Sequence, residues 1–234
     1  MTPIGISPAR RAFLRDALAM APAAVAAGTG AAGSMLARAV CAADAHPFKP
    51  TYFHPAEWIT LNALVDRLIP ADEQGPGAIQ AGVAEFIDLQ MNLPYGYGAL
   101  WYMHAPFVKG ASPLMGYQLE FSPRTMYRTA LAGLAHAVQT QHHKAFNDLD
   151  DASKDALIRD LEHGKLNIGD VPPADFFGQL LQNTYEGYFC DPKHGGNKNM
   201  DAWRMINFPG ARGDYMDWVE QYGKRYPLPP VSIG

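Results

Sequence analysis

Hydrophobic residues recur at helical spacing through the middle of the chain. The clearest run begins at Pro55, carries Leu61 and Leu64 on one face, and is ended by Pro70. A second run with the same spacing covers residues 83–90. No segment sustains the alternation of apolar and polar positions that is typical of a strand. The pattern therefore predicts an all-α domain.

Three further helices are indicated by residues that favour helix starts. Serine and aspartate cap a helix, and proline fits its first turn. These starts lie at Ser122-Pro123, Asp150-Asp151 and Pro173. We expect the first of these helices to reach about Ala145 and the second to end at Gly164. The aromatic stretch 100–108 is left open between a short helix and a loop.

From Gly187 onward, aromatic residues alternate with turn formers and the helical spacing stops. Such a segment cannot bury itself well, so we expect an ordered surface that docks on a partner. The fold class is then an all-α compact domain with a long irregular C-terminal region rich in Pro, Gly and aromatic residues. We interpret residues 187–234 as the partner-docking segment. The residues expected at the interface are Asp191, Pro192, His194, Gly195, Gly196, Asn197, Trp203, Phe208 and Pro209.

The N-terminal segment has the layout of a twin-arginine export signal. Arg10 and Arg11 are followed by Phe13 and Leu14, and then by an uncharged Ala- and Gly-rich run. A Sec signal with a chance arginine pair and a membrane anchor are the alternatives. An anchor needs about 20 strongly apolar residues, and alanine contributes little to insertion. We expect residues 1–43 to be cleaved, which leaves one domain over residues 44–234.

The glycines at Gly28, Gly30 and Gly33 match a dinucleotide-binding pattern inside this export segment. That pattern requires a strand before it and a helix after it. No β-branched run precedes it here, so we reject a nucleotide site.

Composition excludes some partners. The 19 basic and 23 acidic residues give a net charge of −4, without the basic stripe of a nucleic-acid-binding protein. There are two cysteines, Cys41 and Cys190, and cleavage would leave only Cys190. An odd cysteine in an exported protein indicates an intermolecular disulfide or a free thiol, although a buried unpaired cysteine remains an equal alternative.

The residues do not assemble a recognisable catalytic set. His136 and His143 could share a helix face, but no carboxylate or cysteine completes a metal site. Asp72 and Glu73 stand before a helix, where turn chemistry explains them. We therefore expect no catalytic, cofactor-binding or metal-binding residues in this chain. The alternative is an independent periplasmic enzyme that uses its histidines, or a periplasmic binding protein.

The C-terminal motifs resemble the family named after gluconate 2-dehydrogenase subunit 3. That family shows Asp-Pro-x-Tyr-Gly-Gly-Asn, followed by Trp-Lys-x-Ile-Gly-Phe-Pro-Gly. This chain has the first motif at residues 191–197 and the second at residues 203–210, with His194, Arg204 and Asn207 as departures. The stretch 226–232 is similar to the gluconate and ketogluconate branch.

The resemblance implies a non-catalytic small subunit of a three-part periplasmic dehydrogenase. A large subunit would hold FAD and would oxidise a sugar or sugar acid. The resemblance leaves open whether that subunit also holds an iron–sulfur cluster. A membrane-anchored multihaem cytochrome c would pass electrons to ubiquinone. The resemblance also implies that the small subunit carries the large one through the twin-arginine translocase to the periplasmic face of the membrane. Cys190 is the implied candidate for a disulfide to the large subunit.

Overall fold

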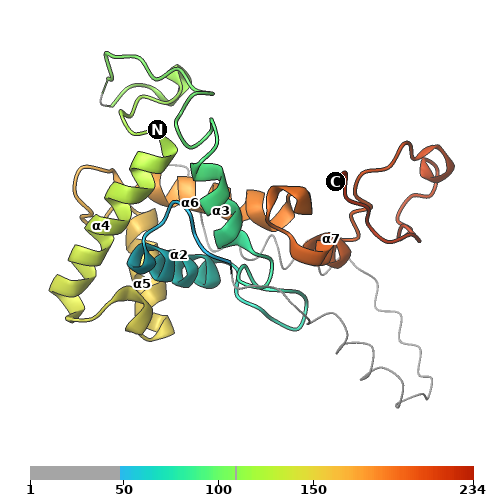
Figure 1. The fold of residues 1–234 in the computed structure, drawn as a ribbon, viewed down its shortest axis with the longest axis horizontal. Helices are drawn as coiled ribbons and strands as arrows, with labels where there is room; N and C mark the ends of the chain where they lie inside the picture. Colours follow the sequence, from blue (N-terminus) through green and yellow to red (C-terminus); the bar gives the residue numbers. More distant parts are fainter. Residues whose placement is uncertain (1–47, 109) are drawn as a thin grey trace. The chain divides into compact units, whose positions relative to one another are not determined.

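The computed structural model describes residues 48–108 and 110–234, and within them the chain forms six α-helices and no strand (Figure 1). The helices are α2 (Pro55–Leu68), α3 (Val83–Met91), α4 (Pro123–His142), α5 (Asp151–Glu162), α6 (Pro173–Phe189) and α7 (Asp201–Ile206). The prediction of an all-α domain is thus confirmed. Among these residues, no helix is long and apolar enough to cross a membrane.

The helices differ from the predicted ones in two places, and the stretch 100–108, which the sequence left open, is a loop. Helix α4 ends at His142 because His143 takes a left-handed conformation with φ 55°, which stops the helix before Ala145. Helix α7 lies inside the segment that was expected to be irregular throughout.

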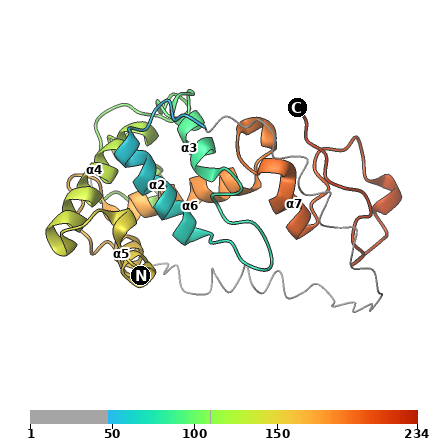
Figure 2. The same cartoon turned by 60° about the horizontal axis from the view of Figure 1, so that its bottom comes forward.

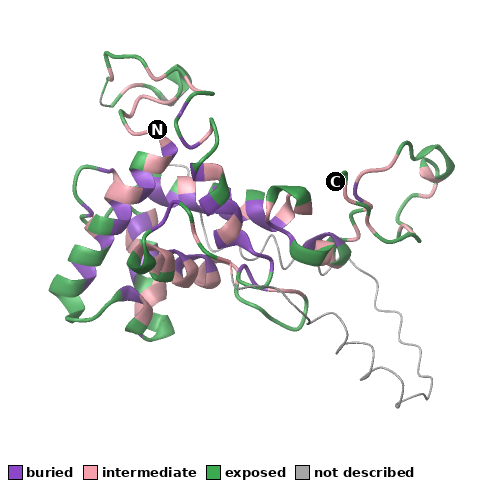
Figure 3. Ribbon diagram, viewed as in Figure 1, coloured by how far each residue is buried: buried purple, intermediate pink, exposed green. Residues whose placement is uncertain are grey.

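Helix α6 runs through the middle of the domain and packs against α2, α3, α4, α5 and α7 (Figures 1 and 2). Its Phe176 meets Tyr127 of α4 edge to face, with 5.7 Å between ring centroids, and Tyr127 meets Phe53 in the same way. All three side chains are buried. Offset aromatic pairs of this kind add to the stabilisation from burial. The buried residues follow the inner faces of the helices (Figure 3).

A buried carboxylate fixes the start of the described chain. Asp88 of α3 is fully buried and accepts hydrogen bonds from the Thr51 amide and hydroxyl, both at 2.8 Å, and from the Tyr52 and Phe53 amides, both at 3.0 Å. Hydrogen bonds to a charged acceptor are stronger than neutral ones. Residues 51–53 are therefore held against α3, although they form no regular element.

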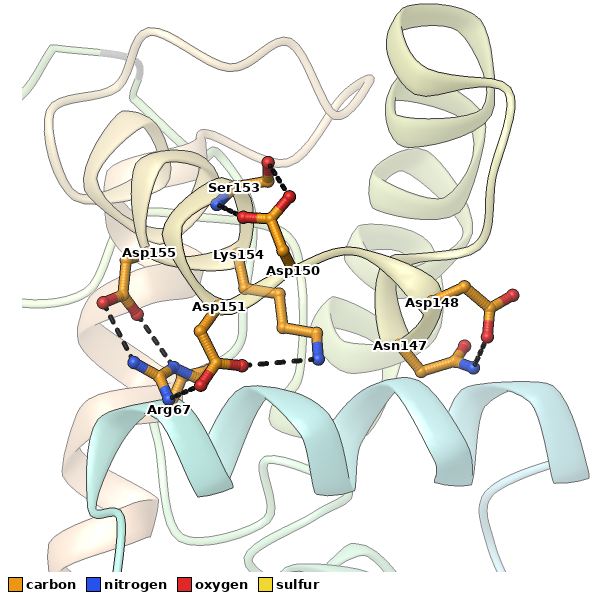
Figure 4. A network of polar contacts seen from close by, with 8 residues as sticks. All are labelled: Arg67, Asn147, Asp148, Asp150, Asp151, Ser153, Lys154 and Asp155. Carbon is orange, nitrogen blue, oxygen red and sulfur yellow. Dashed lines mark hydrogen bonds and ion pairs between the residues drawn. The ribbon is translucent and has the colours of Figure 1, made fainter.

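An arginine joins α2 to α5 (Figure 4). Arg67, near the end of α2, binds Asp155 through two parallel hydrogen bonds of 2.9 and 3.0 Å. A third nitrogen lies 2.7 Å from Asp151 at the start of α5. The paired, two-pronged geometry with Asp155 sets the register between these two helices more firmly than a single contact would.

Candidate functional site

The buried amide of Asn197 organises the turn between α6 and α7. Its backbone N–H donates to the Gly187 carbonyl at 2.9 Å. Its side chain donates to the Cys190 carbonyl at 2.9 Å and accepts from the Ala202 amide at 3.1 Å. The expectation that the segment from Gly187 onward cannot bury itself well is therefore wrong for the turn around Asn197, while most of residues 212–230 are exposed. Asn197 satisfies the backbone groups that a helix or strand would have paired internally.

Trp203 joins α7 to the end of α6. Its indole N–H donates to the Phe189 carbonyl at 2.7 Å, and its side chain is buried. The Trp203 ring packs edge to face on Phe208, with 5.0 Å between centroids. Phe208 itself stays 43% exposed, so one face of this aromatic pair is open to solvent. We call residues 187–208, built around Asn197 and Trp203, the platform.

Asp191 fastens the C-terminus of the chain onto the platform. Its carboxylate accepts from the Ser232 hydroxyl at 2.5 Å and from the Ile233 and Lys193 amides at 2.9 and 3.1 Å. Burial alone would raise the pKa of Asp191. The three hydrogen bonds outweigh that effect and hold this pKa below its ordinary value.

The other end of the C-terminal segment is fastened nearby. The Val231 amide donates to the Pro209 carbonyl at 3.2 Å, and the Ala211 amide donates to the Val231 carbonyl at 2.7 Å. Because both ends are held, residues 212–230 form a loop that leaves the platform and returns to it. We call this loop the arm. In Figure 1 it is the red loop beyond α7.

The arm exposes apolar side chains that the sequence pattern did not single out. Among them, Met216 is 76% exposed and Tyr222 is 86% exposed. The other exposed apolar members are Tyr215, Val219 and Leu228. Isolated exposed apolar residues are ordinary, but a group gathered on one short loop indicates a binding surface.

A second segment shows the same property. The aromatic loop comprises residues 93–108 and 110–122. Its Leu100, Tyr102, Leu114 and Met115 are all exposed. The loop is anchored at Tyr95, whose hydroxyl accepts from the Asn183 side chain of α6 at 2.8 Å. The Tyr95 ring packs against Trp101. The aromatic loop is therefore a second candidate contact surface, attached to the core by polar bonds.

The structure divides the predicted interface residues into two groups. Asp191, Gly196, Asn197 and Trp203 are buried and build the platform, while His194 and Phe208 are exposed. Pro192, Gly195 and Pro209 are partly exposed. Only the exposed and partly exposed members can touch a partner directly. Their role at an interface stays a prediction.

Cys190 follows the last residue of α6 and is partly exposed. Its thiol donates to the Gly187 carbonyl at 3.5 Å. Burial, with a smaller contribution from the Asp191 charge, raises the pKa of Cys190 to about 11. At neutral pH the group is therefore a thiol rather than the reactive thiolate.

The remaining predicted features lie elsewhere. Among residues 48–108 and 110–234, no three His, Cys, Asp or Glu side chains gather as they would around a metal ion. His136 and His143 are exposed. The export residues Arg10, Arg11, Phe13 and Leu14 fall outside the described residues, as does Cys41.

Comparison with known proteins gives one result. The model of the family described as gluconate 2-dehydrogenase subunit 3 matches residues 55–210. This range includes α2 to α7 and the platform, and it ends where the arm begins. Neither a curated protein nor a solved structure matches the chain.

Removing the Asp191 carboxylate should release the C-terminal segment. In Asp191→Ala, we expect the amides of Ala211, Val231 and Ile233 to exchange with solvent at least about tenfold faster, because hydrogen bonds to a charged acceptor are lost. Hydrogen exchange measured by NMR would report each amide. Asp217→Ala, which removes an exposed carboxylate of the arm, is the control and should leave the rates unchanged. Equal rates in both variants would show that Asp191 does not hold the arm.

The raised pKa of Cys190 predicts slow alkylation. In a Cys41→Ser background at pH 8, Cys190 should react with iodoacetamide about 100-fold more slowly than the same cysteine in the urea-unfolded chain, since the pKa is about 2 units higher. The rate should rise about tenfold per pH unit until the pH approaches the pKa. A folded-state rate equal to the unfolded one would contradict the pKa assignment.

Proposed function

The chain belongs to the gluconate 2-dehydrogenase subunit 3 family, and from this premise we propose that it is a non-catalytic small subunit of a periplasmic dehydrogenase complex. The complex oxidises gluconate or a related sugar or sugar acid. The oxidation takes place in a large FAD-carrying subunit. The proposal leaves open whether that subunit also holds an iron–sulfur cluster. A membrane-bound multihaem cytochrome c subunit passes the electrons to ubiquinone.

The observation that carries this proposal is the arm. A chain acting alone gains nothing from holding Met216 and Tyr222 in water, because exposed apolar side chains lower solubility. A subunit gains from it, because an anchored loop loses less conformational entropy when it binds than a free one does. Large aromatic side chains are also enriched among the residues that dominate binding energy.

The proposal gives the small subunit two tasks. It stabilises the large subunit by covering part of its surface, and it supplies the export signal. The twin-arginine route carries folded proteins, so a partner already bound in the cytoplasm can cross with the chain that bears Arg10 and Arg11. The assembled complex then lies at the outer face of the cytoplasmic membrane, held there by the cytochrome subunit.

Cys190 is the candidate for a disulfide to the large subunit. Its sulfur belongs to the platform, beside the residues proposed to face the partner. The high pKa of this thiol makes uncatalysed oxidation slow in the free chain, so we place bond formation after assembly. The alkylation assay applied to the complex tests this, because a bonded Cys190 would be modified only after a reductant is added.

The export task predicts where the flavin subunit will be found. Replacing Arg10 and Arg11 by lysines should leave both this chain and the flavin subunit in the cytoplasm, with periplasmic flavin-dependent dehydrogenase activity reduced at least about tenfold, since the translocase reads the arginine pair itself. Cell fractionation with an activity assay measures this.

The matched control is Arg15→Lys, which makes the same change four residues beyond the pair and should leave export intact. Full periplasmic activity in the double-lysine variant would contradict the escort role. Dehydrogenase activity of the purified chain alone would favour the alternative of an independent enzyme.

A further inference from the structure

A pocket of about 430 Å³ opens between α7 and the last part of the arm. One wall comes from the platform, through Trp203, Arg204, Asn207 and Phe208, and the other from residues 225–230 of the arm. The volume lies in the lower part of the range typical of ligand pockets, about 300–1,000 Å³. Bonds to Asp191 and Val231 hold the arm against the platform beside it.

The two arginines of this pocket differ in their partners. Arg204 forms an ion pair with Asp201 at 2.8 Å, so its charge is balanced within α7. Arg225 donates its Nε–H to the Asn207 side chain at 3.1 Å. Within the described part of the chain, Arg225 forms no ion pair, and its two terminal NH₂ groups make no hydrogen bond to protein. A guanidinium presents five donors in a planar fork that matches a carboxylate.

The surroundings of Arg225 are largely apolar. The Trp203 and Phe208 rings form one side, and Tyr226, Pro227 and Leu228 form the other. Arg225 is exposed in the free chain, so a charge pair with it becomes stronger than one in open water when a partner covers the pocket and excludes solvent. The pocket therefore offers an unbalanced cation beside an apolar wall.

From this arrangement we propose that the pocket receives an acidic side chain, Asp or Glu, from the large flavin-carrying subunit, with Arg225 as its anchor. The inference rests on the proposed function. The lining favours a protein rather than a small free acid, because Phe208 and Leu228 remain 43% and 54% exposed. A small carboxylate would leave these side chains in water, whereas the apolar neighbours of an acidic residue on a protein surface would cover them.

The test uses the complex purified through a tag on this chain. The flavin subunit is allowed to dissociate from the immobilised chain in the presence of a reductant, so that no Cys190 disulfide can hide the effect, and its departure is followed by flavin absorbance. Arg225→Ala should dissociate about tenfold to a hundredfold faster than wild type, because truncating one partner of a charge pair acts on the dissociation rate. Lys224→Ala is the matched control, since Lys224 is an exposed neighbouring cation whose amino group donates to the Gln221 side chain of the arm, and it should behave as wild type.

Arg225→Lys separates charge from shape. It keeps the cation but loses the fork, so its dissociation rate should fall between those of wild type and the alanine variant. Amide exchange at Ala211 and Val231 checks that the arm stays attached in each variant. If the arm is released in a variant, the pocket is tested instead with a photoreactive phenylalanine at position 208 in the otherwise wild-type chain. It should crosslink to a peptide of the flavin subunit that contains Asp or Glu.

The possible failures are distinguishable. A complex that forms normally and dissociates equally fast with Arg225→Ala overturns the pocket assignment and leaves the proposed function standing. A wild-type chain that retains no flavin subunit overturns the proposed function, and the assigned occupant with it. Crosslinks confined to this chain, or acetate bound to the isolated chain at micromolar concentration through Arg225, would also overturn the assignment.

Discussion

The backbone between α6 and α7 forms only two three-residue 3-10 helices, and Asn197 pairs polar backbone groups that a longer element would otherwise satisfy. Its side chain donates to the Cys190 carbonyl and accepts from the Ala202 amide, and its backbone N–H donates to the Gly187 carbonyl. Everything that follows in the chain is placed by this turn. Helix α7 begins from it, Trp203 returns to α6, and Asp191 just before it receives the C-terminus. The platform and the arm therefore depend on one fully buried amide.

This arrangement separates the residues that build the surface from those that can use it. The polar groups of Asn197, Trp203 and Asp191 form hydrogen bonds within the chain. The exposed side chains around them differ in chemistry, from the Phe208 ring to the Arg225 cation. A rigid support under exposed anchors reduces the entropy lost on binding. The family match ends at residue 210, so the platform lies within the matched range and the arm lies beyond it.

The sequence could predict the helices because their information is local. Apolar spacing, with Pro55 in the first turn of α2 and Asp150 as the cap of α5, placed both helices close to their observed positions. It could not predict that the segment after Gly187 folds back on itself, because the bonds of Asn197 depend on a left-handed backbone at φ 44° and carry no periodic pattern. The role of Asp88 was hidden for a related reason. A single aspartate within an apolar helix face gives no indication that three distant amides converge on it.

The same limit applies to the candidate site. The motif at residues 191–197 identified the right region. It could not show which of its residues are buried and support the platform and which are exposed, since both kinds occur side by side in the motif. The pocket at Arg225 was missed altogether. Its two walls are separated in sequence, and they meet through tertiary hydrogen bonds, among them those of Asp191, which no local pattern announces.

The central claim is that this chain is a prefolded small subunit that docks through its exposed apolar segments. Hydrogen exchange, compared between the free chain and the purified complex, tests it most directly. We predict that protection increases in the arm or the aromatic loop when the flavin subunit is bound, while α2 to α6 keep the rates of the free chain because their core is already formed. Protection gained across α2 to α6, with no change in either exposed segment, would contradict the account.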